Sequence, residues 1–110
     1  MKRLMLVGMM GAVLSACGNS DINGAREEVK RNLNDSASAE FRGEKVYRLP
    51  DNTLVCGEVN AKNSYGGYAG FSKYVVEGVG TRPVAKFGEN MQTDVNITCQ
   101  FAELNSKLKQ

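Results

Sequence analysis

Apolar residues recur at helical spacing shortly after Ser20 and Asp21, either of which can cap a helix. Successive members of this series are three, four and four residues apart, which places them on one face of a helix. They are Ile22, Ala25, Val29 and Leu33. Charged residues fill the opposite face. The pattern predicts an amphipathic helix that ends at about Asn34, where an Asn-Asp-Ser sequence forms a stop signal.

The middle of the chain has the pattern of β-strands separated by turns. In the clearest strand, Val55 and Val59 alternate with Leu54 and Cys56, so these pairs point to opposite faces. Turn residues at Pro50-Asp51-Asn52 predict a hairpin with the preceding strand. Strands are predicted over residues 45–49, 53–62, 71–77 and, more briefly, 84–87.

The C-terminal region predicts a helix over residues 101–109, with Phe101, Leu104 and Leu108 on one face. Residues 93–99 fit either a strand or a helix. The fold class is therefore α+β: an N-terminal helix, a three- to four-stranded antiparallel sheet, a C-terminal helix and one disulfide. We expect both helices to pack on one face of the sheet, in a single domain over residues 25–110.

The N-terminus has the organisation of a secretory signal peptide. Two basic residues precede an apolar run at residues 4–14, which is too short to span a bilayer and suits an h-region. Leu14-Ser15-Ala16-Cys17 then resembles the lipobox of bacterial lipoproteins. The resemblance implies removal of residues 1–16 and lipidation of Cys17 with acyl chains such as palmitate. The alternative is an ordinary secretory signal with an incidental cysteine.

The residues after the lipobox predict where the protein resides. Residues 17–24 are expected to form a short lipidated tether, so the domain would sit close to the membrane. Gly18, rather than an aspartate, follows the cysteine. By resemblance to the sorting patterns of Gram-negative bacteria, this implies the periplasmic face of the outer membrane.

Composition limits the chemistry that the mature protein can perform. Removal of 16 residues from the 110-residue chain leaves 94, and twelve basic residues then balance twelve acidic ones. That balance gives no electrostatic reason to bind nucleic acid or an anionic membrane. The sequence contains no histidine, which excludes Ser-His-Asp, Cys-His and His-zinc sites. We therefore expect no enzyme activity, no cofactor and no metal site.

Cysteine arithmetic predicts one disulfide. With Cys17 assigned to lipid, Cys56 and Cys99 remain, and an even number of cysteines in an oxidising compartment favours pairing. Two unpaired thiols are the alternative. Two cysteines are also too few for an all-cysteine zinc site.

The most unusual segment of the mature chain alternates aromatic residues with glycine. Tyr65, Tyr68, Phe71 and Tyr74 recur every three residues around Gly66, Gly67 and Gly70. Glycine permits close approach, and tyrosine offers rigid amphipathic contact area, so the segment predicts a partner-binding loop. The alternative is a hairpin connection whose aromatic side chains pack on the domain itself.

One carboxylate, Glu58, lies within an otherwise neutral predicted strand. It could be buried, with a raised pKa. The simpler interpretation is that it faces solvent or pairs with a nearby Arg or Lys.

Two segments carry a family resemblance: DSASAEFR at 35–42 and VCGEVNAKNSYGGYAGF at 55–71. Together they resemble a group of small exported proteins of proteobacteria and their phages. Ser36 stands where that group usually has proline, and the lipobox is not general in it. The resemblance implies one fold and one disulfide, and it implies no activity.

The whole chain is also similar in type to small phage-encoded lipoproteins that block an outer-membrane receptor from inside and so exclude superinfecting phage. Size, anchor, short tether and the lack of catalytic groups agree with that type. We therefore expect a protein that binds an outer-membrane or periplasmic partner. The alternatives are a periplasmic inhibitor of a lysozyme-type enzyme and a structural envelope lipoprotein.

Overall fold

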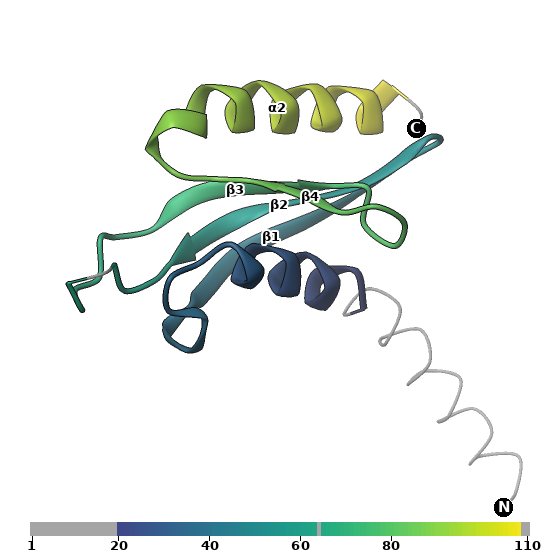
Figure 1. Ribbon diagram of the computed structural model, residues 1–110. Helices are drawn as coiled ribbons and strands as arrows, with labels where there is room; N and C mark the ends of the chain where they lie inside the picture. Colours follow the sequence, from purple (N-terminus) through teal and green to yellow (C-terminus); the bar gives the residue numbers. More distant parts are fainter. Residues whose placement is uncertain (1–19, 64, 109–110) are drawn as a thin grey trace, which may run out of the picture.

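The computed structural model describes residues 20–63 and 65–108, which form two helices and one sheet (Figure 1). Residues 20–31 are helical. Four antiparallel strands follow in the order β1-β2-β3-β4. The further elements are η1 (Ser36–Ser38), β1 (Glu40–Leu49), β2 (Asn52–Asn60), β3 (Ser72–Glu77), β4 (Val84–Lys86), η2 (Glu89–Met91) and α2 (Gln92–Leu108). The predicted α+β class is confirmed. Cys17 and the signal peptide lie outside the described residues.

The two helices cover opposite faces of the sheet (Figure 1), so the expectation of one shared face was wrong. One core cluster joins helix 20–31 to Val55 and Val76, and the other joins α2 to Leu54 and Val75. Consecutive residues are therefore buried in both central strands: Leu54 and Val55 in β2, and Tyr74, Val75 and Val76 in β3. Strands that are covered on both faces carry continuous apolar runs rather than alternation.

Strand β1 begins at residue 40, five residues before the predicted start. A β-bulge interrupts its alternating pattern, which is why the sequence did not predict the first part of the strand. Phe41 and Val46 pack in the same core cluster. Their odd spacing would put them on opposite faces of a regular strand. The register shifts between Arg42 and Lys45, so Gly43 and Glu44 together oppose Gly57. The glycine of the bulge has φ +67°, a left-handed conformation that glycine adopts without steric cost.

Helix α2 runs without interruption from residue 92 to residue 108, so residues 93–99 are helical. Val95 and Ala102 are its buried residues, and Cys99 packs beside them. The three apolar residues that the sequence places on one helical face, Phe101, Leu104 and Leu108, are all largely exposed. The small buried face of α2 therefore holds the helix against the sheet, and its larger apolar side chains point outward.

The N-terminal helix already includes residues 20–24, which were predicted as part of the tether. Only residues 18 and 19 then separate Cys17 from the described helix. Within residues 20–63 and 65–108, no helix combines the length and apolar character needed to cross a membrane. The apolar run at residues 4–14 lies outside that range.

The elements give the molecule two distinct ends (Figure 1). We call one the turn end: the β1–β2 turn lies there, with the start of helix 20–31 and the last turns of α2. Asp21 accepts a hydrogen bond from Arg48 at 2.6 Å, which fixes the start of that helix beside the end of β1. The other is the loop end, where residues 61–71 connect β2 to β3.

Candidate functional site

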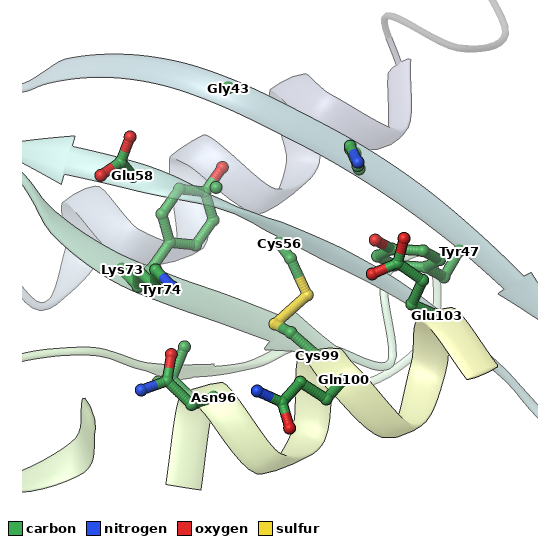
Figure 2. Close-up of a pocket in the computed structure, with 13 residues that line it drawn as sticks. Gly43, Tyr47, Cys56, Glu58, Lys73, Tyr74, Asn96, Cys99, Gln100 and Glu103 are labelled. Carbon is green, nitrogen blue, oxygen red and sulfur yellow. A yellow bond between two sulfur atoms is a disulfide. The ribbon is translucent and has the colours of Figure 1, made fainter. Parts of the chain in front are cut away.

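An open groove of about 310 Å³ lies between α2 and the β1 side of the sheet. The disulfide between Cys56 and Cys99 crosses from β2 to α2 within it (Figure 2). The backbones of Gly43 and Gly57 also line the groove. The predicted pairing of the two cysteines is thereby confirmed.

Polar side chains of both charge signs surround this groove. Tyr47 from β1 and Glu103 from α2 point toward one another across it (Figure 2). Burial, with the neighbouring Glu103 charge, raises the pKa of the Tyr47 hydroxyl. Lys45 and Lys73 contribute cations. The groove therefore exposes several hydrogen-bonding groups. Within the described residues, no three His, Cys, Asp or Glu side chains lie close enough together to hold a metal ion.

A partly buried ion pair on the opposite face connects helix 20–31 to the bulge of β1. The Arg26 guanidinium donates two hydrogen bonds to Glu44, at 2.6 and 3.0 Å, and the Tyr74 hydroxyl donates a third at 3.3 Å. The Glu44 side chain is only 5% exposed. Burial alone would raise the pKa of this carboxyl, but the hydrogen bonds and charge of Arg26 outweigh it and hold the pKa below its ordinary value. These hydrogen bonds hold helix 20–31 against the sheet, so we interpret the cluster as structural.

The Tyr/Gly segment forms an exposed and internally hydrogen-bonded turn at the loop end. Asn63 Oδ1 accepts hydrogen bonds from the backbone N–H groups of Tyr65 and Gly67, at 2.9 and 3.2 Å. Gly66 has φ +84°, which explains a glycine at that position. The Tyr68 hydroxyl donates to the Ser38 carbonyl at 3.1 Å. Tyr65, in contrast, is 95% exposed and projects from the turn.

Phe71 belongs to the domain surface rather than to the exposed turn. The Arg42 guanidinium lies 3.7 Å from the centre of the Phe71 ring, and the same Arg42 pairs with Glu58 at 3.0 Å. Glu58 therefore has the partner that the simpler interpretation expected. Of the five residues predicted to bind a partner, Tyr68 and Phe71 make side-chain contacts with their own chain. Tyr65, Gly66 and Gly67 lie on the exposed turn.

A second exposed surface lies on α2, and the sequence did not predict that this apolar face would be exposed. Four residues at intervals of four, three and four form one apolar face of α2, which we call the apolar stripe. They are Ile97, Phe101, Leu104 and Leu108, with exposed fractions of 61, 64, 60 and 82%. A groove of about 450 Å³ continues this surface toward Leu49 and Leu54 near the β1–β2 turn. A contiguous exposed apolar patch is typical of a surface that contacts a partner or a membrane.

Comparisons with protein-family models, with curated proteins and with solved structures find no match for this chain. The family resemblance of segments 35–42 and 55–71 therefore stays a prediction. The structure brings the two segments together at the loop end. There the Lys62 N–H donates to Ser38 Oγ at 2.9 Å, beside the contact from Tyr68.

Proposed function

We propose that the chain is a lipid-anchored protein of the bacterial outer membrane that acts by binding a protein partner at the periplasmic face. The hydrogen-bonded turn that exposes Tyr65 is the single observation that carries the partner-binding part of this proposal. Its aromatic ring is almost fully exposed, while the hydrogen bonds of Asn63 hold the backbone around it.

The energetics of protein interfaces support a role for such a turn. Tyrosine is enriched among the few residues that carry most of the binding energy, because it buries a large area at low conformational cost. Hydrogen bonds that constrain the backbone before binding, such as those to Asn63, lower that cost further. The turn also lies at the loop end, opposite the start of helix 20–31 (Figure 1). A domain anchored three residues before Ser20 would direct Tyr65 away from the membrane surface.

The form of partner binding that we propose is exclusion of superinfecting phage through an outer-membrane receptor. The test is expression of the full chain in a Gram-negative host, beside a Cys17→Ala variant, followed by challenge with a broad phage panel. The proposal expects reduced plating of at least one phage with the full chain and restored plating with the variant. Unchanged plating across the panel for both proteins would refute exclusion.

Site-specific photocrosslinking tests partner binding independently of any phage. A photoreactive amino acid replaces Tyr65 in the lipidated protein, and a matched control carries it at Val84, an exposed residue of β4. We expect a discrete crosslinked protein from position 65 that is absent from position 84. No product at position 65, or the same products at both positions, would contradict a specific interface at the turn.

A further inference from the structure

The C-terminal half of the apolar stripe lies at the turn end, where the membrane anchor would attach, although α2 and helix 20–31 cover opposite faces of the sheet. Leu104 and Leu108 belong to the last turns of α2, which lie at the turn end (Figure 1). Tyr47, the neighbour of Arg48 in β1, faces Glu103 of α2 across the groove (Figure 2). On the other face of the sheet, Arg48 contacts Asp21 at 2.6 Å. The end of β1 therefore links the start of helix 20–31 to the C-terminal half of α2.

The chain connecting this end to Cys17 is short. Three peptide steps separate Cys17 from Ser20, and they reach at most about 11 Å even when extended. A lipid on Cys17 would therefore keep the turn end within reach of the bilayer surface, whereas the loop end lies at the far side of the domain.

We propose that the C-terminal half of the apolar stripe, Phe101, Leu104 and Leu108, lies against the bilayer into which the Cys17 lipid inserts. This inference rests on the proposed lipid anchor. It adds a second membrane contact and an orientation, with the turn end at the membrane and Tyr65 facing away from it. An amphipathic helix that buries an apolar face at the headgroup boundary supplements the marginal hold of a single lipid chain.

The driving force for this membrane contact is the exposed apolar surface of the stripe rather than the net charge of the protein. The acidic and basic residues of the mature chain balance, so attraction to anionic lipid is weak. The stripe leaves each of its side chains at least 60% exposed in water. Transfer of such surface into an apolar environment is favourable in proportion to its area.

Tryptophan fluorescence tests the contact without background, since the chain contains no tryptophan. The lipidated mature protein carrying Leu104→Trp is purified from membranes and reconstituted into vesicles of phosphatidylethanolamine and phosphatidylglycerol, with or without brominated acyl chains. Leu108→Trp serves as a second probe on the stripe. Tyr65→Trp is the matched control, because that position is 95% exposed at the loop end.

We expect brominated lipid to quench both stripe probes and to shift their emission to shorter wavelength, while it leaves the Tyr65→Trp protein unchanged. Absence of quenching at both stripe positions overturns the inference. So does a blue shift without quenching, which means that a second copy or another protein covers the stripe. Equal quenching at the loop end overturns the orientation.

The mass of each purified protein separates the two proposals before vesicles are made. A lipidated protein whose stripe probes are not quenched overturns the membrane contact and leaves the anchor intact. A protein without lipid overturns both.

Discussion

The disulfide between Cys56 and Cys99 is expected to supply a large share of the stability of this domain. It joins a central strand to α2 across a sequence separation of 43 residues. Closing a loop of that length in the unfolded chain corresponds to about 4 kcal/mol in the chain-entropy model. The net stability of a small domain is only about 5–15 kcal/mol, so the loss would be severe.

The packing of α2 makes this dependence stronger. Only Val95 and Ala102 among its 17 residues are buried, and neither has a large side chain. The apolar stripe points to solvent and contributes little to docking the helix on the sheet. Without the covalent link, we expect α2 to detach before the rest of the fold unfolds, since its contacts with the sheet are few.

The assay is urea unfolding of a Cys17→Ala protein expressed without residues 1–16, followed by circular dichroism, in comparison with the same protein carrying Cys56→Ala and Cys99→Ala. We expect the free energy of unfolding to fall by about 4 kcal/mol and the melting temperature by on the order of 20 °C. Limited proteolysis should cut first within α2. Addition of a reductant should destabilise the parent protein and leave the double variant unchanged.

Refutation would come from a small effect. A decrease of less than about 1 kcal/mol in the free energy of unfolding would mean that the unfolded chain gains little freedom when the disulfide is removed, or that noncovalent contacts hold α2 on the sheet. Equal protease sensitivity along the whole chain would contradict the separate detachment of α2.

Two further predictions concern the opposite face of the sheet. Gly57→Ala should cost about 1–3 kcal/mol in urea unfolding, because its Cβ would lie 2.8 Å from Glu44 Cγ and 3.0 Å from Tyr74 Cε2; Gly67→Ala, in open space, should be nearly neutral. A similar loss in both variants would contradict the steric argument. Glu44→Gln should lower stability by about 1.5–3 kcal/mol at pH 7, the strength of hydrogen bonds to a charged group. Because folding lowers the Glu44 pKa from 4.5, this contribution is present above pH 4.5 and is lost as pH falls through the folded value. The difference between parent and Glu44→Gln should therefore shrink in acid, and a constant difference would contradict the assignment.

Much of the fold could be predicted because local pattern and tertiary packing agree there. The N-terminal helix presents Ala25 and Val29 to the core, as its apolar spacing indicates. The strand containing Val55 and Val59 follows its alternation, and Cys56 points to the other face, where it meets Cys99. The disulfide followed from counting cysteines.

The errors arose where packing overrides the local pattern. The start of β1 was missed because a bulge at Gly43 brings Phe41 and Val46 to one face despite their odd spacing. The placement of both helices on one face was wrong because consecutive apolar residues in β2 and β3 are buried on two sides. A longer apolar run at Tyr74-Val75-Val76 was the available signal of a doubly covered sheet.

The two candidate surfaces were also predicted only in part. Periodicity found the apolar face of α2, but it could not distinguish a face packed on the sheet from one left exposed, because small residues at Val95 and Ala102 make the actual contact. Composition found the turn around Tyr65. Phe71, which shares the spacing of that turn, is instead stacked under Arg42, a contact that only the folded sheet creates.

The measurement that tests the central claim most directly is the intact mass of the protein purified from the membranes of a Gram-negative host. The account predicts a chain that begins at Cys17, lacks its first sixteen residues and carries the added mass of a diacylglycerol and an amide-linked acyl chain. A product of unmodified mass, or one that retains the N-terminal sixteen residues, would contradict it.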